Sequence, residues 1–156
     1  MIITGKALIM GNNVNTDVLH PSQFFSLDDN KVRAGFLQAA AGYEQTGAGD
    51  LSGGIILAGD NFGCGSSRET GARVFALAGV RAIVARSLAR IFSSNVRNLG
   101  LPAVECPALP HLTEGGFEVK IDLNDWTLEM PATGQRFALK RLDPFWEAVI
   151  RAGGLM

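Results

Sequence analysis

The segment "GIILAGD" (residues 54–60) begins the pattern that decides the fold. It is a short continuous apolar run, which is typical of a strand buried on both faces. Two similar runs follow, "RAIVARS" (81–87) and "LPAVEC" (101–106), and a stretch with helical spacing lies between each pair. This order, strand–helix–strand–helix–strand, favours an α/β fold in which at least part of the sheet is parallel and the crossovers are right-handed.

Both intervening stretches end in a helix stop signal. "SRETGARVFALAGV" (67–80) reaches Gly79, and "LARIFSSNVRNLG" (88–100) reaches Gly100. Glycine adopts the left-handed conformation that commonly ends a helix, so each of these glycines is predicted to follow the last helical turn.

The rest of the chain is predicted to be richer in β-structure, with alternating apolar and polar positions near the C-terminus. The expected elements are a strand in 6–10, a helix in 30–43, a hairpin in 116–130, a strand in 132–142 and a helix from Asp143, the predicted N-cap, to the C-terminus. The aromatic residues Trp126, Phe145 and Trp146 are expected to pack in the core.

Composition indicates a globular protein, and residues 1–156 are expected to form a single domain. The chain is 47% apolar and 19% charged, with a net charge of −1, which favours neither nucleic acid nor an anionic membrane. No apolar run approaches the ~18 residues of a membrane span. The N-terminus lacks a charged region and a cleavage site of a signal peptide. We therefore expect a cytoplasmic protein.

The two cysteines and two histidines do not form a motif. Cys64 and Cys106 make neither a disulfide framework nor a C-x-x-C pair, and Cys106 is expected to be buried at a strand end. His111 is expected to be exposed in a loop. Since no cluster has metal-ligand spacing, the chain is predicted to bind no metal or cofactor itself.

The loop "DNFGCGSSRET" (60–70) has the features of an anion site. Its glycines permit tight backbone angles and close approach of a ligand. The following helix is expected to begin near Ser66 or Ser67, so its free N–H groups and positive dipole end point toward the loop. Arg68 adds a planar donor that fits a carboxylate or a phosphate.

Among anions, a substrate carboxylate fits this loop best. The dinucleotide motif G-x-G-x-x-G fails because Arg68 occupies the third glycine position, and no Gly-Lys-Ser/Thr of a Walker A loop follows. Six arginines and one acidic residue lie between Arg68 and Arg97. For all of them except Arg68, a solvated helix face is the preferred interpretation.

The same stretches carry a family resemblance. The chain resembles the small subunit of isopropylmalate isomerase, in the aconitase superfamily, over most of residues 5–107 and the tail. The matching segments are "NFGCGSSRE" (61–69), "GVRAIVARSLARIF" (79–92), "GLPAVECP" (100–107), "NVNTDVLHPSQFF" (13–25) and "RAGGL" (151–155). The resemblance implies a swivelling β/β/α domain, with a mixed sheet and flanking helices, that closes over a large subunit carrying a [4Fe–4S] cluster.

The resemblance also implies roles for individual residues. Ser66 would remove the proton α to a substrate carboxylate while the substrate hydroxyl, held by the partner's cluster, leaves as water; rehydration with the opposite regiochemistry would complete an isomerisation. A serine oxygen needs a cationic and N–H environment for this task. Ser67 and Arg68 would hold the carboxylate, with Gly65 beside them. Asp17 would lie at the edge of the site, although an Asx-turn after Asn15 also accounts for it.

Two departures from the family pattern leave the substrate open. Thr70 stands where most small subunits have a histidine, and the segment 26–50 is unusual where related enzymes choose substrates. Arg33 or Lys31 could contact a second carboxylate there, or be a plain surface charge. The function that the resemblance favours is the small subunit of a hydro-lyase that converts 2-isopropylmalate to 3-isopropylmalate in leucine biosynthesis. The alternatives are a related small subunit for homoaconitate, a methylmalate or citrate, and a stand-alone carboxylate-binding module.

Overall fold

The structure is a computed structural model that describes residues 1–16, 52–65 and 69–155. The helix predicted in 30–43 lies outside the described residues. In chain order, the elements are β1 (Ile2–Ile9), β2 (Ile55–Ala58), α3 (Glu69–Leu77), β3 (Ala82–Ala85), α4 (Arg90–Asn98), β4 (Ala103–Glu105), β5 (Glu118–Asp122), β6 (Thr127–Met130), β7 (Gln135–Ala138) and α5 (Pro144–Arg151).

The strands form one mixed sheet in the order β4-β3-β2-β1-β5-β6-β7. Neighbours from β4 to β1 are parallel, and neighbours from β1 to β7 are antiparallel. The predicted β-α-β-α-β unit and the predicted C-terminal hairpin are both confirmed. β1 joins the two halves, because it pairs in parallel with β2 on one side and in antiparallel with β5 on the other.

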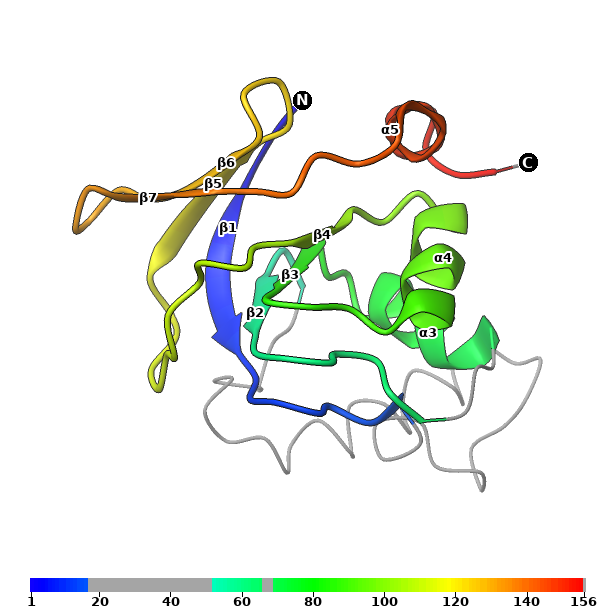
Figure 1. The fold of residues 1–156 in the computed structure, drawn as a ribbon, viewed down its shortest axis with the longest axis horizontal. Helices are drawn as coiled ribbons and strands as arrows, with labels where there is room; N and C mark the ends of the chain where they lie inside the picture. The colour runs from blue at the N-terminus through cyan, green and yellow to red at the C-terminus, as the bar shows by residue number, and fades with distance from the viewer. Residues whose placement is uncertain (17–51, 66–68, 156) are drawn as a thin grey trace.

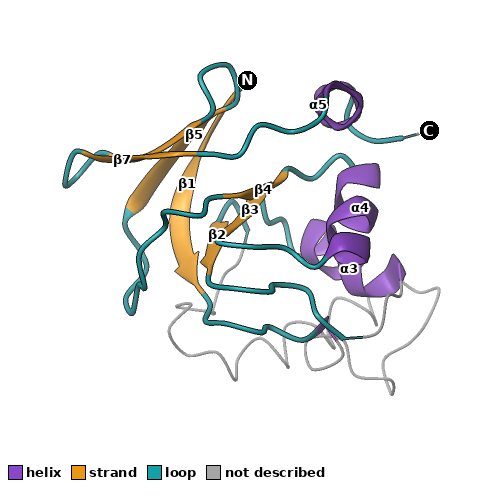
Figure 2. Ribbon diagram, viewed as in Figure 1, coloured by secondary structure: helices purple, strands orange, loops and turns teal. Residues whose placement is uncertain are grey.

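The parallel half of the sheet is covered on both faces. On one face lie α3 and α4 (Figure 1), and the core there contains Ile56 and Ile83. On the other face, Leu57 and Val84 belong to a second core. This core also contains Ile121 and further residues of the antiparallel half, because the sheet curls toward that face (Figure 2). Burial on both faces explains why the central strands are continuous apolar runs rather than alternating ones.

The ends of α3 and α4 and the start of α5 lie where the sequence predicts, whereas the predicted start of α3 at Ser66 or Ser67 lies outside the described residues. Gly79 has a φ of 81°, and the N–H of Val80 donates to the carbonyl of Phe75 at 3.2 Å, which is the bond of a Schellman motif. Gly100 ends α4 in the same way. Asp143 is the N-cap of α5, since its Oδ1 accepts from the N–H of Phe145 at 2.8 Å. None of the helices in the described ranges has the length and apolar character needed to cross a membrane.

The prediction that all three C-terminal aromatic residues pack in the core is wrong for Phe145. Trp126 is buried, whereas Phe145 is 54% exposed. The helix α5 contacts α4, and its buried residues are Val149 and Ile150. Phe145 lies in the first turn of α5, and its ring contacts the ring of Trp146 at a centroid distance of 5.0 Å.

Candidate functional site

The segments that leave β1 and β2 run side by side beyond the carboxyl ends of the strands. The N–H of Met10 donates to Leu57 at 3.0 Å, the N–H of Gly63 donates to Val14 at 2.9 Å, and the N–H of Thr16 donates to Cys64 at 3.0 Å. In open α/β sheets, ligands bind outside the carboxyl ends of the strands. The glycine loop that carries the predicted chemistry therefore begins at the edge of the sheet where a ligand site is expected.

Phe62 fixes the same loop to the segment that follows β3 and to the core. Its N–H donates to the carbonyl of Ser87 at 3.1 Å, and its carbonyl accepts from Ala89 at 2.8 Å, which ties the loop to the segment after β3. The ring of Phe62 is fully buried between Phe75 and Phe92, at centroid distances of 5.8 and 5.5 Å. No role was assigned to Phe62 from the sequence. An aromatic residue inside a polar, glycine-rich loop could have indicated that the loop is attached to the core at that position.

The glycines of the loop adopt backbone angles that other residues avoid. Gly63 has a φ of 88° and Gly65 a φ of 106°, which confirms the prediction of tight backbone angles. A Cβ on Gly63 would overlap the buried ring of Phe92, so the loop passes over that ring without room for a side chain. Gly65 is exposed, and its predicted contact with a substrate stays a prediction.

Most of the predicted site residues cannot be placed. The structure describes Gly65, but five of the six predicted residues lie outside the described ranges: Ser66, Ser67, Arg68, Asp17 and Arg33. Their described chain neighbours do come together. The N–H of Thr16 donates a hydrogen bond to the carbonyl of Cys64, and a Cβ on Gly71 of α3 would lie 3.3 Å from the Cβ of Thr16. The end of the first segment, the glycine loop and the first turn of α3 therefore meet at one place.

A polar network that the sequence did not predict lies at the base of the loop. Nη2 of Arg86 donates to Oδ1 of Asn12 at 2.8 Å, and Nε of Arg86 is paired with Oδ1 of Asp60 at 3.2 Å. The expectation that Arg86 is a solvated helix-face charge is wrong, because Arg86 follows β3 and its side chain is only 23% exposed.

Arg97 also departs from that expectation. Its Nε donates to the carbonyl of Ala103 at 3.0 Å, its guanidinium lies over the ring of Trp146, and burial lowers its pKa. It is a structural residue between α4, β4 and α5.

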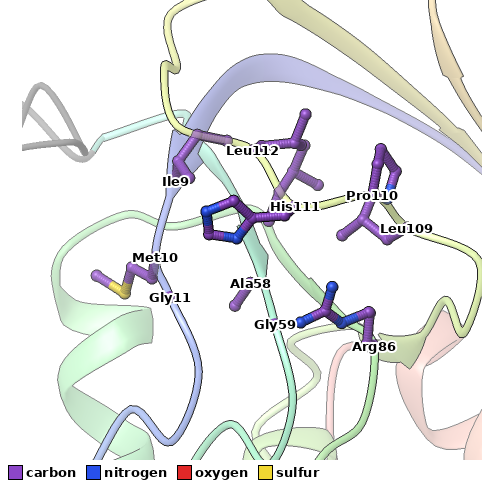
Figure 3. Close-up of a pocket in the computed structure, with 11 residues that line it drawn as sticks. Ile9, Met10, Gly11, Ala58, Gly59, Arg86, Leu109, Pro110, His111 and Leu112 are labelled. Atoms are coloured by element: carbon purple, nitrogen blue, oxygen red, sulfur yellow. The ribbon is translucent and has the colours of Figure 1, made fainter.

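A shallow cleft lies at the same edge of the sheet (Figure 3). Its lining includes Gly11, Gly59 and Arg86 on one side and the segment 109–112 on the other. His111 is exposed on this segment, which confirms its predicted exposure in a loop, and it also lines the cleft.

The two cysteines lie in different environments. Cys106 is fully buried at the end of β4, as predicted, and burial raises the pKa of its thiol. Its Sγ lies 3.5 Å from the carbonyl of Ala138, to which it donates. Cys64 lies in the glycine loop and is only partly buried.

Alkylation should therefore distinguish the two thiols. Because the thiolate is the reactive form, a raised pKa and full burial both slow the reaction of Cys106 at neutral pH. We expect iodoacetamide to modify Cys64 in the native chain and Cys106 only after unfolding, as measured by mass spectrometry of peptides over time. Equal rates for the two native thiols would contradict the buried position of Cys106.

The described part of the chain offers little to hold a metal ion, and the full sequence has few cysteines for a cluster. Within the described residues, no three His, Cys, Asp or Glu side chains are grouped so that they could bind a metal ion. A [4Fe–4S] cluster is commonly held by four cysteine thiolates, and the full sequence contains two cysteines. The donor set of this chain therefore does not fit such a cluster.

Comparisons with known proteins agree on one class. The family model of the aconitase C-terminal domain matches residues 7–109. The 3-isopropylmalate dehydratase small subunit of Moorella thermoacetica is 40% identical over 157 residues, covering 100% of this chain and 93% of that protein. The 2,3-dimethylmalate dehydratase small subunit of Eubacterium barkeri is 38% identical, covering 97% and 93%.

A solved structure supports the same assignment. The crystal structure of 3-isopropylmalate dehydratase from Methanocaldococcus jannaschii matches with a TM-score of 0.84 and 30% identity, covering 99% of this chain and 91% of that one. The fold is thus of the aconitase-type swivelling class that the resemblance implied. Within that class, the chain belongs to the 3-isopropylmalate dehydratase small-subunit family of hydro-lyases.

Proposed function

We propose that this chain, acting with a large subunit, isomerises 2-isopropylmalate to 3-isopropylmalate by dehydration and rehydration in the leucine pathway of the cytoplasm. The similarity extends over the full chain, and the relatives at 38–40% identity include 3-isopropylmalate dehydratase small subunits. The observation that carries the proposal is the hydrogen bond between Thr16 and Cys64. It joins the two segments that lead directly into Asp17 and into the serine pair, so residues distant in sequence can serve one site.

The chemistry assigned to this chain is proton transfer and carboxylate binding. In the proposed dehydration, Ser66 takes the proton from the carbon next to a carboxylate, and the substrate loses its hydroxyl as water. In the rehydration, water adds to the double bond of the unsaturated acid with the opposite regiochemistry: its hydroxyl goes to the carbon that lost the proton, and Ser66 returns a proton to the carbon that lost the hydroxyl. The negative serine oxygen is stabilised by N–H groups at the start of α3 and by Arg68.

The other proposed site residues bind the substrate. Ser67 and Arg68 hold a carboxylate, and a bidentate guanidinium–carboxylate pair fixes its orientation as well as its position. Gly65 leaves room for the substrate against the backbone, Asp17 lies at the edge of the site, and Arg33 contacts a second carboxylate.

The large subunit is proposed to supply the [4Fe–4S] cluster. As a Lewis acid, the cluster would assist the departure of the substrate hydroxyl. The donor set of this chain does not fit such a cluster. We therefore propose a site shared between two subunits, in which this chain transfers the proton and binds the carboxylate while the large subunit assists departure of the hydroxyl. We further propose that residues 1–156 act as one swivelling domain that closes over the partner.

The choice of substrate needs an experiment because relatives differ in their named activities. One relative is named 2,3-dimethylmalate dehydratase, and another, from Methanocaldococcus jannaschii at 34% identity, is named isopropylmalate/citramalate isomerase. The test is to co-purify the chain with its large subunit and to measure kcat/KM for isopropylmalate, citramalate, dimethylmalate, homoaconitate and citrate. We expect the largest value with isopropylmalate, and a tenfold preference for another acid would overturn that assignment.

A preparation of the isolated chain tests the alternative of a stand-alone carboxylate-binding module. Full-length similarity to subunits of dehydratases gives that alternative no support. We expect calorimetry of the isolated chain to show no micromolar binding of di- or tricarboxylates. Micromolar binding in the absence of a partner would favour the module.

A further inference from the structure

Three side chains connect the ends of three parallel strands at the base of the glycine loop. Asn12 follows β1, Asp60 follows β2 and Arg86 follows β3. Oδ1 of Asn12 accepts two hydrogen bonds, from the N–H of Asp60 at 2.8 Å and from Nη2 of Arg86 at 2.8 Å. One amide oxygen thus holds the main chain of one segment and the side chain of another.

Arg86 makes a two-pronged contact with the loop. Its Nε donates to Oδ1 of Asp60 at 3.2 Å, and its Nη2 donates to Oδ2 at 3.4 Å. Its main-chain N–H is shared between the carbonyls of Ala58 and Gly59, at 3.2 and 3.1 Å. The planar guanidinium presents its donors in a fixed geometry, which lysine cannot reproduce.

Gly59 leaves the space that this network needs. A Cβ on Gly59 would overlap Oδ1 of Asn12 and would lie 3.1 Å from Nη2 of Arg86. A residue with any side chain at this position would therefore displace one of the two partners. Figure 3 shows Arg86 and Gly59 on the same wall of the cleft.

The network continues into the loop itself. The N–H of Asn13 donates to the carbonyl of Asp60 at 2.8 Å. Asn61 adopts a φ of 56°, its N–H donates to Oγ of Ser87 at 2.8 Å, and its amide donates to Oδ1 of Asn13 at 3.2 Å. The backbone direction of the loop is therefore set from both sides before the chain reaches Gly63.

We propose that Arg86 is a positioning residue for the reaction, which holds the base of the loop through Asp60 and Asn12 so that the serine pair is presented in a fixed place. This inference rests on the proposed function of that pair. The carboxylate of Asp60 is 60% exposed, and exposed ion pairs contribute little to stability. Loss of Arg86 should therefore change the position of the glycine loop more than the stability of the chain. Catalysis is sensitive to such a change, since a shift of about 1 Å can cost about 100-fold in rate.

The first test uses the complex with the large subunit. Arg86→Gln should lower kcat at least tenfold with a smaller change in KM, because misplacement of a base affects the transition state more than substrate binding. Arg86→Lys should recover part of kcat, and Asn12→Ala should lower it in the same direction. Arg86→Gln combined with Asp60→Asn should be no worse than Arg86→Gln alone, since residues of one network are not additive.

The matched control is Arg141→Gln. It removes another guanidinium–carboxylate pair, with Glu147 at 3.6 Å, away from the glycine loop. This variant should keep the wild-type kcat. A wild-type kcat in the Arg86→Gln complex, or an equal loss in both variants, would overturn the inference.

The second test does not depend on activity. Hydrogen exchange of the full chain should become faster at the amides of residues 61–65 in Arg86→Gln and Asn12→Ala, and stay unchanged in Arg141→Gln. Unchanged exchange in the loop would overturn the inference. If the wild-type complex lacks dehydratase activity, the proposed function fails, whereas faster exchange would still show that Arg86 orders the loop.

Discussion

Replacement of Ser66 by alanine should reduce kcat of the assembled enzyme by about 10²–10⁴-fold, the range that a positioned general base contributes. The proposed role of the hydroxyl is to exchange the proton next to the carboxylate, and alanine has no group that can do so. Because the change removes a single oxygen, we expect the affinity for the large subunit to stay the same. Initial rates of formation of the unsaturated acid, measured at equal subunit concentrations, provide the readout.

Ser94→Ala is the matched control for this prediction. Ser94 lies on α4, and its Oγ donates to the carbonyl of Arg90 in the same helix at 3.2 Å. Its removal should leave kcat unchanged. A kcat for Ser66→Ala within twofold of the wild-type value would show that another group removes the proton.

The largest effect on stability is expected from Gly63→Ala. A left-handed φ of 88° costs a non-glycine residue about 1–2 kcal/mol. The added Cβ would also overlap the ring of Phe92, which is 5% exposed and cannot move into solvent freely, and overpacking of a core costs about 1–3 kcal/mol. We expect a loss of about 2–5 kcal/mol in the free energy of unfolding, measured by urea denaturation.

Gly116→Ala separates the cost of the left-handed backbone from the cost of the overlap with Phe92. Gly116 has a φ of 89°, nearly the same as Gly63, but no atom lies within 4 Å of where its Cβ would be. The free energy of unfolding of this variant should fall only by the cost of the left-handed backbone, about 1–2 kcal/mol. If both variants lost the same free energy, the packing of Gly63 on Phe92 would not be the constraint that we describe.

The parallel half of the fold could be predicted because its signals are local. Each central strand is a continuous apolar run, and Gly79 and Gly100 mark the helix ends within a residue or two of the last helical turn. The N-cap at Asp143 is equally local, since its oxygen bonds a group two residues away. Such features depend on the near neighbours of a residue, which the sequence shows directly.

The network at the base of the loop could not be predicted because its members are far apart in the chain. Asn12 is 48 residues from Asp60 and 74 from Arg86, and only the parallel pairing of three strands brings them together. The exposure of Phe145 is a similar case, because it depends on which residues of α5 are buried when the helix packs on the rest of the fold. For the site, the sequence motif predicted the family, whereas the roles of the serine pair, Arg68, Asp17 and Arg33 stay predictions.

The central claim is that this chain supplies one half of an active site that a large subunit completes. The most direct measurement is dehydratase activity during titration of a fixed amount of the large subunit with this chain. We predict no activity from either subunit alone, a linear rise as the chain is added, and a plateau at a constant ratio. Activity of the large subunit that does not change on addition of the chain, or full activity of the chain without the partner and without iron, would contradict the claim.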